Sequence, residues 1–180
     1  ISNRLDVLNT TLDPVKLSYY LSKLKKQKIE NVILEASSHG LKQNRLDGLE
    51  FRTAIFTNLS HDHLDYHKNF KDYLSSKLYL FEKLLKRNSN VITDTEIPEY
   101  KKIKNISLRR KLNIKTISSK KGNLIIVSHQ YLGEKQIVKI KYKKNFFNFT
   151  TDLIGKIQIK NILMSIIAAE KSGLKFQRII

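Results

Sequence analysis

The chain has no cysteine among its 180 residues. It can therefore form neither disulfide bonds nor metal sites with thiolate ligands, and it suits a reducing compartment. Long apolar runs are also missing, since none approaches the roughly 20 residues that span a bilayer. The N-terminus lacks the charged-then-apolar pattern of a signal peptide. Together these absences predict a cytoplasmic protein that does not bind a membrane.

Acidic residues are scarce relative to basic ones, with 16 Asp and Glu against 34 Lys and Arg and a formal net charge of +18. Clustered basic residues bind nucleic acids by releasing counterions from phosphates, so a basic nucleic-acid-binding module is one alternative. The lysines, however, occur from Lys16 to Lys175 in short clusters that are not interleaved with aromatic residues. This pattern favours lysines spread over solvated faces, whose field would still attract an anionic nucleotide substrate. We therefore expect no nucleic-acid partner.

Helical spacing of apolar residues predicts three helices. They run from Pro14 to about Lys28, from Asn69 to about Arg87, and from about Lys160 to Lys171. Asp13 is an N-cap followed by proline in the first helical position, and Gly173 is a C-cap of the last helix.

Short apolar runs predict strands between these helices. Three of them, residues 31–35, 53–57 and 91–93, are continuous, as in buried parallel strands. After about Asn113 the runs at 124–127, 137–142 and 146–150 are partly alternating and predict an antiparallel extension at the edge of the sheet. The fold class is therefore α/β, a largely parallel sheet flanked by helices with a small antiparallel extension.

Polar residues follow the first predicted strand in the segment Glu35–Gly40, which reads Glu-Ala-Ser-Ser-His-Gly. Ligands of open α/β sheets bind outside the carboxyl ends of the strands. An acid at that edge can hold a cation, and small residues let a substrate approach the backbone. A strand-to-loop turn with a solvated glutamate is the alternative interpretation.

A second polar segment, Ser60–His67, follows the next predicted strand and contains three histidines and two aspartates. Imidazole is a common metal ligand, and carboxylates suit hard cations. The alternative is a polar loop whose histidines cap the next helix.

Lys77 shares a predicted helix face with four apolar residues, namely Phe70, Leu74, Phe81 and Leu84. An ammonium on an apolar face is costly unless it is paired, neutralised or able to reach water. Burial lowers the pKa of a lysine, and a neutral amine can react with carbon dioxide to form an anionic carbamate. The spacing alone leaves two interpretations open. The Lys77 ammonium reaches water past the apolar residues, or the Lys77 amine is chemically modified.

These pieces, in this order and spacing, resemble the central domain of the Mur ligases. The matching residues are Asn9–Thr11, Glu35–Gly40, Gln43, Arg45, Asp47–Gly48, Phe56–His67 and Lys77. The resemblance covers the whole chain and weakens between about Asn88 and Phe149. It implies the P-loop-type α/β fold of that domain and an ATP-dependent ligase that adds meso-diaminopimelate or L-lysine to UDP-N-acetylmuramoyl-L-alanyl-D-glutamate in peptidoglycan synthesis.

The resemblance also implies a role for individual residues. The residues that would bind the UDP-muramoyl dipeptide are Asn9, Thr10, Thr11, Ser37, Gln43 and Arg45. Glu35, His63 and the carbamate of Lys77 would be the catalytic groups and would hold Mg²⁺. Asn161 would contact the nucleotide, although Gln158 stands where the family usually has Asn. The partners would be ATP as co-substrate, the dipeptide nucleotide and the diamino acid.

The family's phosphate-binding loop is missing, because no Gly-x-x-x-x-Gly-Lys-[Ser/Thr] occurs in the chain. The N-terminal domain that holds the uridine nucleotide and the C-terminal domain that receives the amino acid are missing as well. We therefore expect residues 1–180 to be an incomplete central domain of a longer ligase, inactive alone.

A zinc hydrolase of the metallo-β-lactamase type is the other enzymatic alternative, since its His-x-His-x-Asp-His signature is similar to His61–His67. Here Tyr66 separates Asp65 from His67, so the register is wrong by one residue. Downstream of this segment, only His129 is left to supply a distant histidine ligand.

Overall fold

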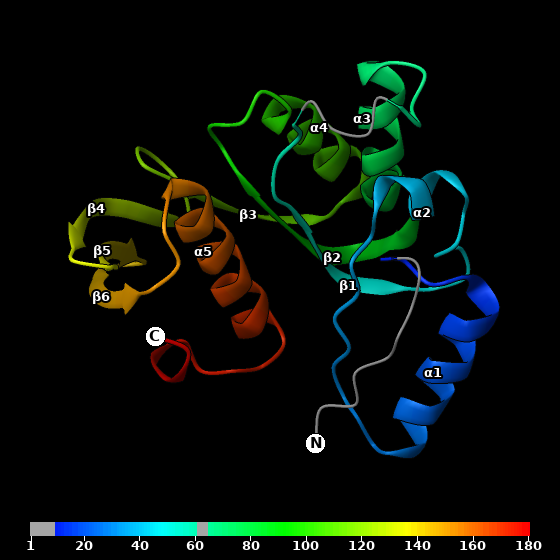
Figure 1. Ribbon diagram of the computed structural model, residues 1–180, viewed down its shortest axis with the longest axis horizontal. Coiled ribbons are helices and arrows are strands. Elements are labelled where there is room, and N and C mark those ends of the chain that lie inside the picture. The colour runs from blue at the N-terminus through cyan, green and yellow to red at the C-terminus, as the bar shows by residue number, and fades with distance from the viewer. Residues whose placement is uncertain (1–9, 61–64) are drawn as a thin grey trace. The chain divides into compact units, whose positions relative to one another are not determined.

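A computed structural model describes residues 10–60 and 65–180 (Figure 1). The chain divides into two compact units, which we name by their content. The helical unit comprises residues 1–50 and 60–84, and the sheet unit comprises residues 51–59 and 85–180. No helix of the described residues is both long enough and apolar enough to cross a membrane.

The sheet unit is built on a six-stranded sheet with the strand order β1-β2-β3-β4-β5-β6. The strands are β1 (Phe51–Phe56), β2 (Leu85–Asp94), β3 (Asn113–Ser118), β4 (Leu124–Leu132), β5 (Lys135–Tyr142) and β6 (Asn145–Thr151). Strands β1 to β4 pair in parallel, and β5 and β6 continue the sheet antiparallel to their neighbours. This confirms the α/β class, the largely parallel sheet and the antiparallel extension at its edge.

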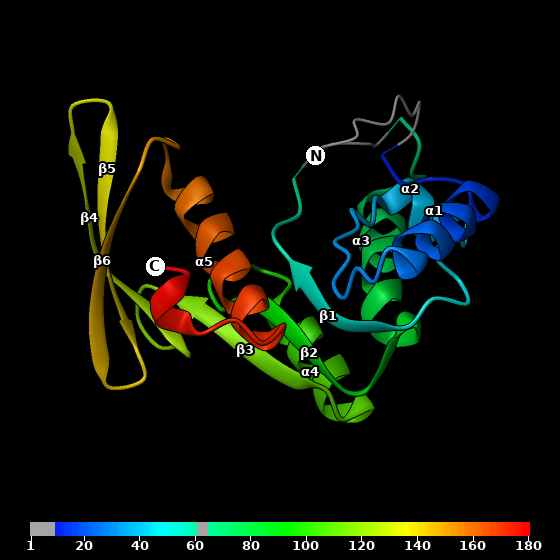
Figure 2. The same ribbon diagram turned by 90° about the horizontal axis from the view of Figure 1, so that it is seen from below.

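Helices α4 (Tyr100–Arg110) and α5 (Lys156–Lys171) cover opposite faces of the parallel strands (Figure 2). A hydrophobic core cluster lies under α5, where Leu163 and Ile167 pack with Ile92 of β2 and Ile140 of β5. A 3₁₀ turn, η2 (Phe176–Arg178), closes this core with Phe176, whose ring stacks on Tyr142 at 4.2 Å. Because α5 packs on both parallel and antiparallel strands, it fixes the extension to the main sheet.

The helical unit contains α1 (Pro14–Lys26), α2 (Ser38–Lys42), α3 (Phe70–Tyr79) and a π-helical turn, η1 (Leu80–Leu84). Asp13 caps α1 by accepting a hydrogen bond from the Lys16 N–H at 3.0 Å, as the sequence predicts. The buried apolar side chains of the unit come from all of these elements and include Leu17, Leu41, Leu46, Leu74 and Phe81. A hydrogen bond of 2.9 Å from the Tyr79 hydroxyl to Asp47 ties α3 to the loop after α2.

Two predictions about elements were wrong. Residues 31–35 form no strand, and Ile33 is 97% exposed. A strand needs a hydrogen-bonding neighbour, and the described part of the helical unit contains no strand to pair with. The helix expected to reach Arg87 ends at Leu84, because Leu85 already pairs with Phe51 in the sheet.

Helix α4 and strand β3 were not predicted. In α4 the buried side chains are few, Ile103, Ile106 and Ser107, in a segment rich in lysine and arginine. Its apolar stripe is therefore narrow and does not stand out in the sequence.

Candidate functional site

The residues expected to bind substrate meet around the short helix α2. Ser37 is the N-cap of this helix, and its hydroxyl accepts a hydrogen bond of 3.1 Å from the Gly40 N–H. The buried Thr11 hydroxyl donates to the Glu35 carbonyl at 2.8 Å and accepts from the Ser37 N–H at 2.9 Å. These bonds join segments 24 to 26 residues apart, so they hold residues 35–37 against the chain before α1.

Gly40 allows this close approach. A Cβ atom at Gly40 would lie 2.6 Å from the Cβ and Cγ2 atoms of Thr11. Such distances are well inside van der Waals contact, and Thr11 is buried, so the two segments could not stay in place. Glycine is thus needed here for space, since its backbone is not in the left-handed region.

Arg45 extends the same cluster. Its Nη1 donates to the Thr11 carbonyl at 2.7 Å, and its Nε donates to Gln43 Oε1 at 2.8 Å. The Gln43 amide donates in turn to the Tyr66 hydroxyl at 2.9 Å. Four of the six predicted substrate residues, Thr11, Ser37, Gln43 and Arg45, therefore form one hydrogen-bonded cluster. Thr10 is exposed beside it, and Asn9 lies outside the described residues.

His67 contacts the first turn of α2. Its side chain is fully buried, its Nε2 lies 2.9 Å from the Ser38 hydroxyl, and its Nδ1 lies 3.5 Å from Asp72 Oδ2. Asp72 also binds the Lys42 ammonium at the end of α2. The imidazole stacks on the buried Tyr73 ring at a centroid distance of 4.9 Å. This second cluster, which connects α2 to α3, was not predicted, although its histidine belongs to the His-rich segment noted in the sequence.

The electrostatics of this cluster favour a neutral imidazole. Burial lowers the pKa of His67 below 6.5, and the nearby Lys42 ammonium lowers it further, while Asp72 opposes both. The Asp72 carboxylate has a lowered pKa, mainly because of its hydrogen bond with Lys42. A neutral imidazole keeps one donor and one acceptor nitrogen, so it can bond the Ser38 hydroxyl without placing a charge in the core.

Lys77 lies one turn along α3 from this cluster. Its side chain is half-buried, and its Nζ lies 5.3 Å from the centroid of the Tyr73 ring, whose contact with His67 is described above. Leu74, Phe81 and Leu84 of the predicted stripe are buried, whereas Phe70 is 37% exposed. The aromatic ring gives the ammonium a favourable contact without full burial.

Glu35 and His63 complete the predicted catalytic set. The Glu35 backbone is held by Thr11, and its side chain is exposed. His63 lies outside the described residues, as do its neighbours 61, 62 and 64. Among the residues that the structure describes, no three His, Cys, Asp or Glu side chains are grouped closely enough to hold a metal ion. A carboxylate and a lysine carbamate are hard oxygen donors, and this donor chemistry fits Mg²⁺.

The predicted nucleotide contact, Asn161, is half-buried on α5 in the sheet unit. The residue before it, Lys160, lies 2.5 Å from Asp94 and 3.2 Å from Glu96. Glu96 also accepts hydrogen bonds from the hydroxyl and the N–H of Ser119, and with Lys160 these lower its pKa to about 2. The first turn of α5 is therefore fixed to the carboxyl ends of β2 and β3, which holds Asn161 at that edge.

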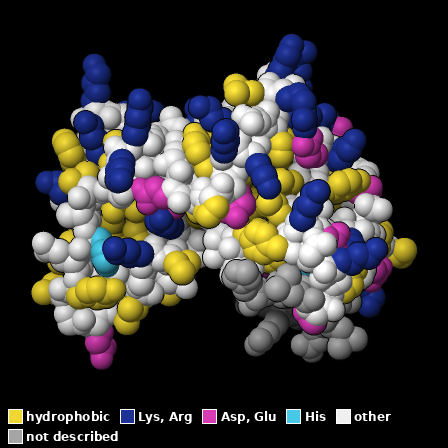
Figure 3. All heavy atoms as spheres, turned by 90° about the horizontal axis from the view of Figure 1, so that it is seen from above, with side chains coloured by type: hydrophobic (Ala, Val, Ile, Leu, Met, Phe, Trp, Pro, Cys, Tyr) yellow, Lys and Arg dark blue, Asp and Glu magenta, His cyan; other side chains and the backbone are white. Residues whose placement is uncertain are grey.

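Basic side chains are distributed over the surface. Figure 3 shows lysine and arginine spread across the visible face with acidic side chains among them. On this face, such a mixture of charges is typical of solvated lysine side chains.

Comparison with known proteins places this geometry in a family. The family model described as the Mur ligase middle domain matches residues 3–169. The chain is 31% identical over 165 residues to the UDP-N-acetylmuramoyl-L-alanyl-D-glutamate–2,6-diaminopimelate ligase of Agrobacterium fabrum, covering 92% of the chain and 34% of the relative. The ligase of the same name from Wigglesworthia glossinidia brevipalpis is 36% identical over 173 residues, covering 94% and 34%. The chain thus spans about a third of the length of these relatives.

Solved structures agree in fold. A structure of a UDP-N-acetylmuramoyl-L-alanyl-D-glutamate–2,6-diaminopimelate ligase superposes with a TM-score of 0.85 at 28% identity, over 95% of this chain and 35% of the other. MurF ligase from Thermotoga maritima, solved with ADP, superposes with a TM-score of 0.62 at 15% identity and covers 78% of this chain and 31% of the other. At this identity the likeness shows a shared fold alone.

Proposed function

Since this chain belongs to the Mur ligase family, matching its middle domain over residues 3–169, we propose that it is the central ATP- and substrate-binding part of a diaminopimelate-adding ligase. The reaction joins the diamino acid to UDP-N-acetylmuramoyl-L-alanyl-D-glutamate at the expense of ATP. The names of the relatives favour 2,6-diaminopimelate over lysine as the added residue. Such an enzyme works on soluble substrates, which suits a cytoplasmic location.

The observation that carries the proposal is the hydrogen-bonded cluster of Thr11, Ser37, Gln43 and Arg45. Arg45 has five N–H donors, and its hydrogen bonds to Thr11 and Gln43 use two of its nitrogens. The remaining donors form a planar fork that suits a carboxylate or phosphate of the dipeptide nucleotide. Because hydrogen bonds within the protein connect these side chains, little ordering of them would be needed on binding.

The chemistry requires a carboxylate to be phosphorylated by ATP before the amine attacks the resulting acyl phosphate. Mg²⁺ supplies neutralisation of the crowded anions and orients the transferred phosphoryl group. Glu35, His63 and Lys77 as a carbamate would hold it. The role of His67 and Tyr73 would be to keep α2 and α3 in register, so that the loop after Glu35 and the Lys77 side chain face the same substrate.

A chimera tests this function. The matching third of the Agrobacterium fabrum ligase is replaced by this chain, and phosphate release is measured with ATP, diaminopimelate and the UDP-muramoyl dipeptide. We expect release that requires all three substrates. In the chimera, Arg45→Ala should raise KM for the dipeptide nucleotide about tenfold or more, since a charge-assisted contact is lost.

Arg52→Ala is the matched control, because Arg52 is an exposed arginine on β1 of the sheet unit and forms none of the hydrogen bonds of this cluster. It should leave KM unchanged. A chimera that unfolds cooperatively on heating, binds ATP and yet releases no phosphate with the three substrates would refute the proposed function.

A further inference from the structure

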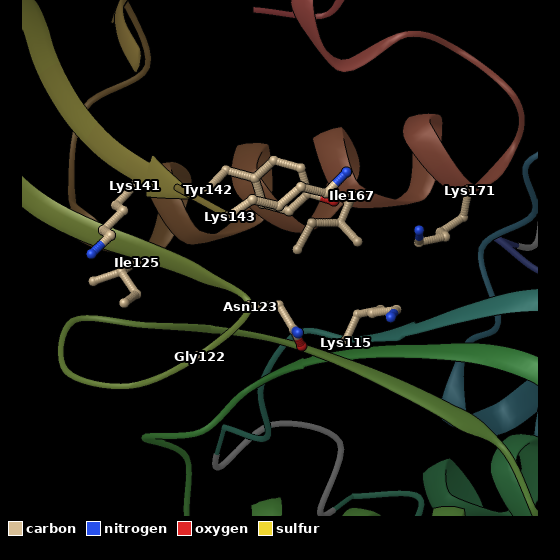
Figure 4. A pocket seen from close by; sticks show the side chains of 9 residues that line it. All are labelled: Lys115, Gly122, Asn123, Ile125, Lys141, Tyr142, Lys143, Ile167 and Lys171. Atoms are coloured by element: carbon tan, nitrogen blue, oxygen red, sulfur yellow. The ribbon is translucent and has the colours of Figure 1, made fainter. Parts of the chain in front are cut away.

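The sheet unit contains a cavity of about 340 Å³ whose lining is strongly basic. Four of the nine lining residues are lysines, Lys115, Lys141, Lys143 and Lys171, and none is acidic. Figure 4 shows Asn123 and Lys115 on the side of β3 and β4, with Ile167 and Lys171 of α5 opposite them. The volume lies in the range of small-ligand sites in proteins.

Asn123 presents a fixed donor to this cavity. Its Oδ1 accepts hydrogen bonds from the Thr116 N–H at 2.9 Å and from the Thr116 hydroxyl at 3.3 Å. A backbone N–H can only donate, so the oxygen of the amide must face Thr116. The Nδ2 group therefore points away from Thr116, and within the described residues it has no hydrogen-bond partner.

The positive charges of the lysines that line the cavity are only partly neutralised by nearby carboxylates. Glu170 lies 3.6 Å from Lys143 and 3.2 Å from Lys171, and it also accepts a hydrogen bond from the Tyr142 hydroxyl. Lys115 is half-buried on β3, and no ion pair joins it to any carboxylate in the described part of the chain. Among the described residues, the lysines of this lining therefore carry more positive charge than the one nearby carboxylate neutralises.

The end of α5 does not cancel this charge. The C-terminal end of a helix carries partial negative charge on its unbonded carbonyl groups. Here the Ala168, Ala169 and Glu170 carbonyls accept hydrogen bonds from the N–H groups of Ser172, Leu174 and Gly173. Because these carbonyls are capped, their effect on an anion in the cavity is reduced.

We propose that this cavity binds a phosphate-bearing anion, with a diphosphate group as the preferred ligand. Lys115, Lys143 and Lys171 line the cavity with the Asn123 amide and match an anion with several oxygens and more than one negative charge, whereas the Lys141 ammonium lies over the Phe146 ring. A single carboxylate would leave most of these donors without a partner. The site belongs to the sheet unit and does not depend on the ligase function proposed above.

Pyrophosphate is the probe that tests the site. Titration of the 180-residue chain by isothermal calorimetry at low and at physiological salt should show one site whose affinity falls with salt. In ¹H–¹⁵N spectra the amide signals of Gly122 and Asn123 should shift on binding. ADP is titrated in parallel: weakening of its binding by the substitutions below assigns a nucleotide source, and no such weakening assigns the free anion.

Two substitutions remove donors from the cavity lining. Asn123→Asp keeps the acceptor for Thr116, loses the Nδ2 donor and adds a negative charge that repels an anion, and Lys115→Gln removes one positive charge. Each should weaken pyrophosphate binding about tenfold. Lys101→Gln, on the exposed face of α4, removes the same charge elsewhere and should change affinity less than about twofold.

Circular dichroism of each variant checks that the fold is retained. Equal weakening by Lys101→Gln and Lys115→Gln would show that only the general field of a basic protein is measured, and it would overturn the proposal. Absence of pyrophosphate binding at millimolar concentration and low salt would overturn it as well.

Discussion

His67 Nε2 lies 2.9 Å from the hydroxyl of Ser38, a residue 29 positions earlier in the chain. This contact connects the His-rich segment to the first turn of α2, whose N-cap Ser37 belongs to the proposed substrate site. The fully buried imidazole therefore supports the proposed substrate site without belonging to it.

Replacing His67 by alanine should lower the free energy of unfolding by about 2–4 kcal/mol, because it leaves a cavity beside Tyr73 and removes the partner of Ser38. Urea denaturation measures the change. Lys68→Ala, at the exposed neighbouring position, should stay within about 0.5 kcal/mol of the parent. Equal effects of the two substitutions would contradict the assigned role of the imidazole.

The lowered pKa of His67 makes stability depend on pH. The unfolded chain takes up a proton near pH 6.5 that the folded protein resists, mainly because of burial. The stability that the neutral His67 contributes is therefore fully present above pH 6.5. It is lost as the pH falls from 6.5 toward the pKa of His67 in the folded protein. Histidine NMR titration checks this, with the His67 signals still neutral at pH 6.5.

Lys42→Met provides the matched comparison for that titration. It removes a cation that lowers the pKa of His67 and frees Asp72, which raises it. The pKa of His67 should therefore rise in this variant. An unchanged or lower value would be inconsistent with the electrostatics of the cluster.

Glu96 predicts a second dependence at lower pH. Its pKa is lowered to about 2, chiefly by hydrogen bonds from Ser119. The stabilisation is present above pH 4.5 and is lost as the pH falls from 4.5 toward 2. Because the side chain is 31% exposed, its size should be only about 1 kcal/mol after solvent screening.

Ser119→Ala should raise the pKa of Glu96, so the free energy of unfolding should fall less between pH 4.5 and pH 2. Urea denaturation between pH 2 and 6 measures this change. Ser128→Ala, at an exposed position on β4, is the control and should leave the pH dependence of the free energy of unfolding unchanged. If both variants follow the parent curve, Ser119 is not the main cause of the shift.

Lys77→Ala in the active chimera should reduce turnover on the order of 100-fold, because a charged group that would organise the magnesium site is lost. Added formate or acetate should restore part of the activity by replacing the carbamate oxygens. Lys71→Ala, at an exposed position of α3, should have no effect. Unaffected turnover in Lys77→Ala would dismiss the carbamate role.

A direct measurement complements that assay. In the chimera supplied with ¹³C-bicarbonate, the Lys77 carbamate should give a ¹³C NMR signal that is missing in Lys77→Ala and retained in Lys71→Ala.

Periodicity and capping residues determined much of the fold from the sequence. Asp13 with Pro14 specified the start of α1, and the apolar runs specified β1, β2 and the antiparallel extension. These signals are local, since each depends on residues a few positions apart. The motif from Glu35 to Lys77 likewise indicated the Mur ligase family, which the family match confirms.

Only the tertiary structure decided how residues distant in the sequence meet. Residues 31–35 have the apolar composition of a strand, yet they form none, because pairing depends on a neighbour that composition cannot supply. The contacts of Thr11 with Ser37, His67 with Ser38 and Asn123 with Thr116 depend in the same way on how separate segments are brought together. The sequence thus predicted which residues carry the chemistry, and packing decided which of them contact each other, because hydrogen bonds form only between groups held within about 3 Å.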